Sequence, residues 1–230
     1  GIRLSLQQTK VEQPKVPTPG KPWTVPTGSI EMIWCKPGTF MMGSPESEEG
    51  RGLAGRKINN YNETQHQVML TKGFYLGKYE VTQAQWKKVM ATSPSKFFGE
   101  KRPVEQVNWA EAVRFCQELT LMERKAGRLP NGWEYALPTE SEWEYACRAG
   151  TTTVFSFGDS LSSKQANFNG TEPYGGAAKG PNLEQTTAVG SYAANPWGFY
   201  DMHGNVREWC TDWHGNYPIT QLTDPTGPTS

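Results

Sequence analysis

Hydrophobic and polar residues alternate in two stretches near the start of the chain. Residues 31–43 alternate on either side of Pro37-Gly38, which predicts a strand, a turn and a second strand. Residues 66–80 repeat the pattern around Thr71-Lys72-Gly73 and predict two further strands. Between them, residues 44–65 are charged and contain several glycines, which is typical of a surface loop.

Three later segments change to a helical period. Each begins with a Thr or Asn that is followed three residues later by Gln or Glu, the pairing of a capping box. The pairs are Thr82 with Gln85, Asn108 with Glu111, and Thr139 with Glu142. Apolar residues then recur three or four apart, which predicts helices with one buried face. The expected buried residues are Trp86, Val89 and Met90, then Ala112, Cys116 and Leu119, then Trp143, Ala146 and Cys147.

Two long stretches show no such period. Residues 1–28 are polar and contain five prolines, which predicts an extended linker and implies an additional domain before it. Residues 29–230 would then form the folded domain. Residues 151–197 are rich in Gly, Asn, Thr and Ser, and a structureless loop of this length is uncommon inside a compact domain. We therefore expect this loop to be functional or to be held in place by other groups.

Composition narrows the classes of protein that fit. The 23 basic and 23 acidic residues give a net charge of zero, which argues against nucleic acid as a partner. No apolar run reaches the roughly 18 residues that a membrane span needs. Nine Trp, nine Tyr and nine Phe, with 24 Gly and 17 Pro, predict an aromatic core and many turns. The four cysteines form no C-x-x-C pair, so the sequence does not indicate a structural zinc site.

The segment 198–213 reads Gly-Phe-Tyr-Asp-Met-His-Gly-Asn-Val-Arg-Glu-Trp-Cys-Thr-Asp-Trp and fits neither period. Its large rings and acids predict an ordered loop that is folded around something. Asp201 and Glu208 can offer side-chain oxygens, and the carbonyls of Gly204 and Val206 lie between them. Oxygens at this spacing suit calcium, which takes roughly 6–8 oxygen ligands. The alternative is that Glu208 pairs with Arg207 or a helix end while Asp201 caps a turn.

Residues 198–209 closely resemble the signature Gly-Leu-Tyr-Asp-Met-x-Gly-Asn-Val-Trp-Glu-Trp of the formylglycine-generating enzyme family, also called sulfatase-modifying factors. Four other stretches match the family's motifs in the same order. They are residues 38–44, 74–82, 102–109 and 137–146. The resemblance implies an α+β fold of the irregular, loop-rich, C-type-lectin-like kind, with low regular secondary structure and bound calcium.

The resemblance also assigns calcium ligands. Asp201, Gly204, Val206 and Glu208 match one calcium site of the family position by position. Another calcium site of the family uses an Asn and the following carbonyl, which match Asn167 and Phe168. The family completes that second site with an Asp and a carbonyl two residues later, and this sequence has no clear Asp there.

Catalytically active members bind copper through two cysteines beyond the signature, and they use oxygen to convert a substrate cysteine into formylglycine. That stretch, which begins Arg-Gly-Gly-Ser, is absent from a sequence ending at Ser230. The resemblance therefore implies a domain that is incomplete at its C-terminus, with copper expected only where such a cysteine pair exists.

A second departure from the family lies inside the signature. Arg207 stands where the family has a Trp that lines the peptide-binding cleft of active enzymes. The change implies a different ligand, bound by Arg207 and Trp209. The alternative is a structural salt bridge between Arg207 and Glu105 or Asp212.

Two functional hypotheses remain. The first is a non-catalytic, calcium-stabilised module that binds a peptide or protein, as an appendage of a larger bacterial protein. The alternative is a formylglycine-generating oxidase that acts on a sulfatase cysteine, with its cysteine pair beyond Ser230.

Overall fold

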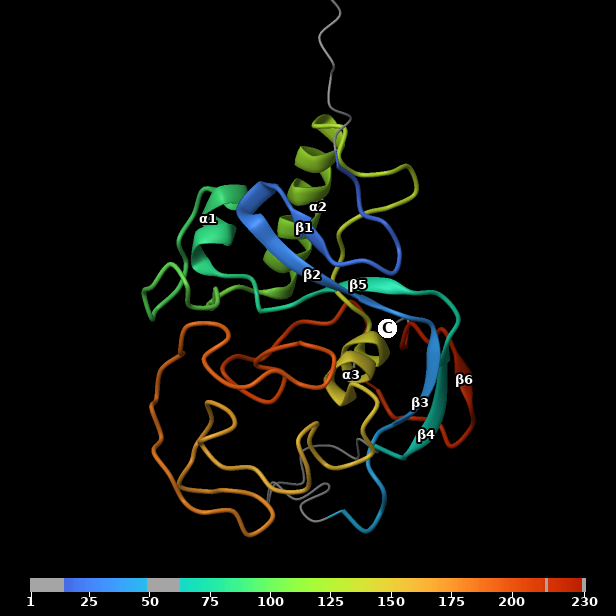
Figure 1. The fold of residues 1–230 in the computed structure, drawn as a ribbon, viewed down its shortest axis with the longest axis vertical. Coiled ribbons are helices and arrows are strands. Elements are labelled where there is room, and N and C mark those ends of the chain that lie inside the picture. Colours follow the sequence, from blue (N-terminus) through green and yellow to red (C-terminus); the bar gives the residue numbers. More distant parts are fainter. Residues whose placement is uncertain (1–14, 49–62, 214, 229–230) are drawn as a thin grey trace, which may run out of the picture.

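A bent two-stranded ribbon forms the frame of the fold (Figure 1). The structure is a computed structural model that describes residues 15–48, 63–213 and 215–228. The strands are β1 (Trp23–Val25), β2 (Ile30–Cys35), β3 (Gly38–Met42), β4 (His66–Leu70), β5 (Phe74–Gly77) and β6 (Leu222–Thr223). β2 pairs with β5 and β3 pairs with β4, both antiparallel. The ribbon thus passes through two sheets, ordered β1-β2-β5 and β3-β4-β6.

The ribbon bends between the sheets at the two predicted turns. Cys35 lies opposite Phe74 and Gly38 lies opposite Leu70, so Pro37 faces the short segment that ends at Gly73. A Cβ on Gly73 would lie 2.3 Å from the ring of Trp34, and only glycine fits there. The four predicted strands are confirmed. Most of the predicted surface loop at 44–65 lies outside the described residues.

Three helices begin where the sequence predicts. They are α1 (Gln83–Met90), α2 (Trp109–Lys125) and α3 (Glu140–Arg148). All three capping boxes are present, since the side chains of Thr82, Asn108 and Thr139 each accept a hydrogen bond from the backbone N–H three residues later. α1 and α3 end at Ala91 and Ala149 in the left-handed region, with φ of 57° and 49°.

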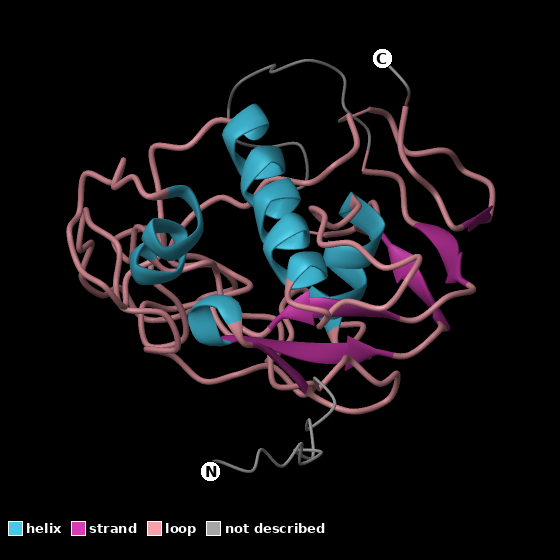
Figure 2. Cartoon of the chain, turned by 90° about the horizontal axis from the view of Figure 1, so that it is seen from above, coloured by secondary structure: helices cyan, strands magenta, loops and turns pink. Residues whose placement is uncertain are grey.

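The buried side chains form two clusters on either side of the ribbon's bend. α1 and α2 pack beside the β1-β2-β5 sheet (Figure 2). Between these two helices, Trp86 stacks on Phe115 with ring centroids 5.3 Å apart. The second cluster surrounds α3 and includes the fully buried Phe199. The predicted residues Trp86, Ala112, Leu119, Ala146 and Cys147 are buried, while Val89, Met90, Cys116 and Trp143 are partly buried.

The predicted linker at residues 1–28 contains a strand of the folded domain, β1. Residues 1–14 lie outside the described part of the chain. Trp23 and Val25 both point into the core, and Val25 is completely buried. The folded unit therefore begins before residue 29, because alternate side chains of this proline-flanked segment pack inside.

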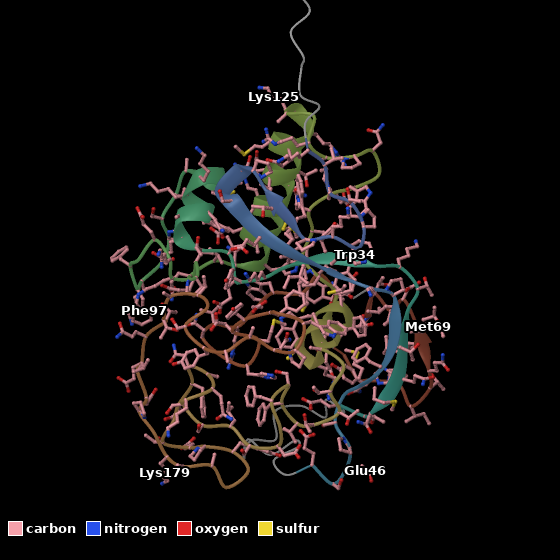
Figure 3. All side chains as sticks on the ribbon, in the orientation of Figure 1. Trp34, Glu46, Met69, Phe97, Lys125 and Lys179 are labelled. Carbon is pink, nitrogen blue, oxygen red and sulfur yellow. The ribbon has the colours of Figure 1, made fainter. Side chains whose placement is uncertain are left out.

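The long segment 151–197 contains no α-helix or β-strand and forms layered loops below α3 in Figure 1. Side chains and single bridges tie it down, as predicted. The Asn195 side chain donates to the Ala146 carbonyl at 2.7 Å, and Leu161 and Tyr174 exchange backbone hydrogen bonds of 3.2 and 3.0 Å. Lys179 in this segment and Lys125 at the end of α2 lie at opposite ends of the molecule (Figure 3).

The result is the predicted irregular, loop-rich α+β fold with low regular secondary structure. None of the described helices has the length and apolar character that crossing a membrane requires.

A buried ion pair fixes the end of α2 against the short helix η1 (Thr27–Ser29). Glu123 is fully buried and accepts two hydrogen bonds from Arg128, at 2.8 and 2.7 Å, and one from the Thr27 N–H at 3.2 Å. Burial acts to raise the pKa of Glu123, but these hydrogen bonds outweigh it and leave the pKa below its ordinary value.

We predict that Glu123→Ala lowers the free energy of unfolding by about 3 kcal/mol, because it leaves donors without their buried acceptor. Urea denaturation near neutral pH measures the change. The control is Glu118→Ala, which removes the exposed pair with Arg114 at 3.8 Å and should cost less than about 1 kcal/mol. Equal losses in the two variants would contradict a structural role for the Glu123 pair.

Candidate functional site

The segment 198–213, called the signature loop below, is anchored by apolar residues and turned by polar ones. Phe199 and Met202 are buried in the cluster around α3. Asp201 and Asn205 adopt left-handed conformations with φ of 58° and 67°. Asp and Asn tolerate this region better than other non-glycine residues, so they reverse the chain at little cost. The loop therefore directs several backbone and side-chain oxygens inward.

Two buried carboxylates at this loop each have one oxygen without a partner. Asp201 accepts the Gly190 N–H through Oδ2 at 2.6 Å, and Glu80 accepts the Asn205 amide through Oε2 at 2.9 Å. Asp201 Oδ1 and Glu80 Oε1 are buried and have no hydrogen-bond partner among the described residues. A buried acceptor left unpaired costs about 1–3 kcal/mol, and more when it is charged. These two oxygens therefore point to a missing positive partner.

The raised pKa values of the acids around the loop also indicate buried negative charge without a positive partner. Burial, and then the charges of Glu208 and Asp201, raise the pKa of Glu80 to about 9. Burial also raises the pKa of Asp201, although the Gly190 N–H acts to lower it. These shifts mean that the protein alone does not compensate the negative charge it buries here. They also place Glu80, Asp201 and Glu208 within electrostatic range of one another.

Glu80 is the residue that the sequence analysis missed. It lies just after β5, inside the matched motif at residues 74–82, and it was assigned no role. The sequence feature that could have indicated Glu80 is a single acid soon after a mainly apolar strand.

Asn205 connects the three segments that meet at the site. Its amide donates to Glu80, and its Oδ1 accepts from the Thr187 N–H at 2.8 Å and from the Asn167 amide at 3.2 Å. Its backbone N–H donates to the Asn167 carbonyl at 2.8 Å. This residue therefore joins the segment after β5, the 151–197 segment and the signature loop, and it holds Glu80 through Oε2.

The remaining predicted calcium ligands lie along the same loop. A Cβ on Gly204 would lie 2.6 Å from the Asn167 carbonyl, so the close approach requires glycine. The Gly204 carbonyl accepts the Val206 N–H at 2.9 Å. Glu208 accepts the Trp143 indole at 3.1 Å, and although the residue as a whole is exposed, desolvation of its carboxylate raises its pKa to about 7.

The predicted second pair, Asn167 and Phe168, belongs to the same region. The Asn167 amide donates to the Gln185 carbonyl at 2.9 Å and to Asn205, so this side chain is engaged in binding the signature loop. Phe168 is half-buried, and within the described ranges its carbonyl accepts no hydrogen bond. The structure thus connects Asn167 to the first predicted site through Asn205.

The donor set fits a hard cation such as calcium better than a transition metal. The unpartnered atoms at the loop are carboxylate oxygens, although across the described part of the chain no three His, Cys, Asp or Glu side chains are grouped as metal ligands, so at most two of these acids are placed to share one cation. A cation here would be held by Glu80 Oε1 and Asp201 Oδ1, with backbone carbonyls and water completing the shell. Calcium accepts such a mixture of oxygens.

An apolar cavity of about 210 Å³ opens beside the signature loop. Trp86, Phe115 and Leu119 line its inner part, and Glu80, Arg207 and Trp209 belong to its lining from the side of the loop. The structure therefore brings together the two residues that were predicted to bind a ligand, Arg207 and Trp209, and places them beside the proposed cation ligands.

Two tryptophans attach the signature loop to the start of α2. The Trp209 indole donates to the Val107 carbonyl at 3.1 Å, and the Trp109 indole donates to the Cys210 carbonyl at 2.9 Å. Their side chains are nevertheless 48% and 43% exposed, so each offers a ring face to solvent. Anchored, exposed aromatic rings are common in recognition surfaces.

The four cysteines are free, and none is activated. Burial raises the pKa of Cys35, Cys147 and Cys210 to about 12 and that of Cys116 to about 11. A thiol reacts as its thiolate, which these environments disfavour.

His203, also in the signature loop, packs against two aromatic rings. The rings of Phe155 and Phe157 lie edge-on to it, with centroids 5.4 and 5.1 Å away. Its Nε2 accepts hydrogen bonds from the Ser156 N–H at 3.1 Å and the Ser156 hydroxyl at 3.0 Å. Burial, and then the charge of Arg148, lower the pKa of His203 to about 4. The imidazole is therefore neutral at pH 7 and acts as an acceptor.

Known proteins are similar to this chain over most of its length. The family model described as the sulfatase-modifying factor enzyme 1-like domain matches residues 21–224. Among curated proteins, the chain is 37% identical over 177 residues to the chaperone protein LppX of Paenibacillus barcinonensis, which covers 62% of this chain and 63% of that protein. It is 29% identical over 171 residues to the formylglycine-generating enzyme of Mus musculus, which covers 72% of this chain and 41% of that enzyme.

A solved structure has a similar fold over most of the chain. Treponema denticola variable protein 1 superposes with a TM-score of 0.68 at 26% identity, over 93% of this chain and 84% of that one. The chain spans less than two thirds of the length of each of the two curated relatives named above.

We predict that His203 makes the protein less stable as pH is lowered from about 6.5 towards 4. The effect is seen as the difference between the wild type and a His203 variant, because the raised pKa values of Glu80 and Glu208 act on stability in the opposite direction. The folded state holds His203 neutral while the unfolded chain binds a proton, so unfolding takes up a proton in this range. This contribution should reach about 3 kcal/mol at pH 4. His203→Gln keeps an acceptor for Ser156 and should flatten this part of the pH profile, measured by urea denaturation. Parallel profiles for the two proteins would show that His203 is not the group responsible.

Proposed function

The chain belongs to the sulfatase-modifying factor enzyme 1-like family, and on this premise we propose that it is a calcium-stabilised module that binds a protein or peptide. Calcium would be held by Glu80, Asp201 and the carbonyls of Gly204 and Val206, and Glu208 would add its negative charge nearby. Arg207 and Trp209 would contact the ligand. The observation that carries the proposal is that Glu80, Arg207, Glu208 and Trp209 line one apolar cavity beside the signature loop.

The unpartnered oxygens of Glu80 and Asp201 support calcium at this position. A divalent cation would compensate both carboxylates and remove the cost of burying them. When bound, calcium would supply structural charge, and the chain's own residues would provide the recognition surface. Asn205 and Gly190 would orient the two carboxylates through the hydrogen bonds described above.

A binding role is supported by one of the similar proteins. The name of the chaperone LppX, 37% identical to this chain, is consistent with a role that involves binding another protein.

The second candidate is the formylglycine-generating oxidase, with a sulfatase cysteine as substrate. The similarity to the mouse formylglycine-generating enzyme favours it. Copper would then be bound by residues other than the described cysteines.

We predict that excess calcium stabilises the protein by about 2–3 kcal/mol and that chelation reverses the effect. Glu80→Gln and Asp201→Asn should lose most of this gain because each removes a ligand charge. In chelator, both variants should be at least as stable as the wild type, since they remove a buried carboxylate that lacks a partner. Thermal melting with and without calcium measures both effects.

The matched control is Glu134→Gln, which changes an exposed acid outside the loop and should keep the full calcium response. If Glu80→Gln and Asp201→Asn respond to calcium as strongly as the wild type, the cation site is elsewhere and this part of the proposal fails.

The two candidate functions separate in one binding experiment. The calcium-loaded protein is incubated with a displayed library of random peptides, and bound peptides are recovered and sequenced. The binding module predicts enriched peptides that are unchanged after incubation, with enrichment lost in Trp209→Ala. The oxidase predicts that cysteine-containing peptides acquire an aldehyde, detected by hydrazide labelling in the presence of copper and oxygen. Aldehyde formation would overturn the non-catalytic assignment.

A further inference from the structure

Arg207 is a cation without a partner in the described part of the chain. It takes part in none of the ion pairs or hydrogen bonds found there, and the residue is exposed. The two acids that could have paired with it are engaged elsewhere. Glu105 accepts the Phe97 N–H at 2.8 Å, and Asp212 accepts the Glu140 N–H at 2.9 Å. The structural salt bridge considered from sequence is therefore not formed.

The cavity beside Arg207 is apolar and small. Its volume of about 210 Å³ lies below the roughly 300–1,000 Å³ of typical small-molecule sites, so it suits one large side chain better than a whole metabolite. Val107 and Pro138 contribute to its lining together with Trp209. An apolar side chain placed there would lie beside the guanidinium of Arg207.

We propose that the ligand of this site is a peptide segment in which a carboxylate side chain, Asp or Glu, lies next to a large apolar side chain. The apolar side chain would fill the cavity and the carboxylate would pair with Arg207, whose planar guanidinium matches carboxylate geometry. This inference rests on the proposed binding function and specifies the ligand class for the same site.

The acids around Arg207 couple this recognition to the cation. Glu208 follows Arg207 directly, and Glu80 also lines the cavity. The charge of Asp201 also acts on Glu80, whose pKa it raises. Without a cation, ionised acids at this site would repel an acidic ligand. Bound calcium would offset that charge, so the acidic peptide should bind the calcium-loaded protein more tightly than the chelated one.

Short fluorescent peptides in a Gly-Ser background test the ligand class by anisotropy. One peptide carries Glu-Phe, one carries Lys-Phe and one carries Glu-Ala. The wild type should bind Glu-Phe about tenfold more tightly than either of the others, and raised salt should weaken this preference. Arg207→Glu should reverse the charge preference, so that Lys-Phe becomes the better ligand. A gain for Lys-Phe also shows that the variant is folded.

The outcomes separate this inference from the function on which it rests. Equal binding of Glu-Phe and Lys-Phe by the wild type, or no reversal in Arg207→Glu, would overturn the acidic ligand while leaving peptide binding in place. Equal binding of Glu-Phe and Glu-Ala would overturn the cavity's role. Enrichment of unrelated peptides from the displayed library, with none of these three bound, would reject the inference alone, whereas no binding of any peptide would reject the proposed function as well.

Discussion

Two carboxylate oxygens that are buried without a partner, on Glu80 and Asp201, set the main physical constraint on this structure. A folded chain does not keep such charge uncompensated without cost, because water solvates it far better than the protein interior does. The segments that converge here come from distant parts of the sequence. Glu80 follows β5, Gly190 and Asn167 belong to the long loop segment, and Asp201 lies in the signature loop. Since these loops have little regular structure, their shared polar centre determines how they are arranged.

The recognition surface follows from this centre. Arg207 and Trp209 lie a few residues beyond Asn205, whose hydrogen bonds connect β5, the long loop and the signature loop. The Trp209 indole then fastens the loop to the start of α2. Any group that orders the carboxylates therefore also orders the residues proposed to contact ligand. A binding face made from loops can be rigid in this way although few of its residues belong to helices or strands.

Local rules explain which parts of the fold the sequence could predict. The helix starts were predictable because a capping box is made by residues three apart, as in Thr82 with Gln85. β1 was missed because Trp23 and Val25 stand among prolines, and only packing against a distant core selects an extended segment there.

The site was predictable in part. Asp201 and Glu208 were visible as acids within one segment. Glu80 lies 121 residues before Asp201 in the sequence. Its position at the site depends on the hydrogen bond of 2.9 Å that it accepts from the Asn205 side chain, and no local sequence pattern predicts that bond. The sequence also could not show that Arg207 forms no salt bridge, because Glu105 and Asp212 accept hydrogen bonds from backbone N–H groups instead.

Glu80 and Asp201 are proposed to hold a cation between them. The most direct test is a crystal structure of the calcium-loaded protein with anomalous diffraction data collected at long wavelength. We expect an anomalous peak within calcium-ligand distance, about 2.3–2.6 Å, of Glu80 Oε1 and Asp201 Oδ1. Well-ordered carboxylates with no such peak, in crystals grown with excess calcium, would contradict it.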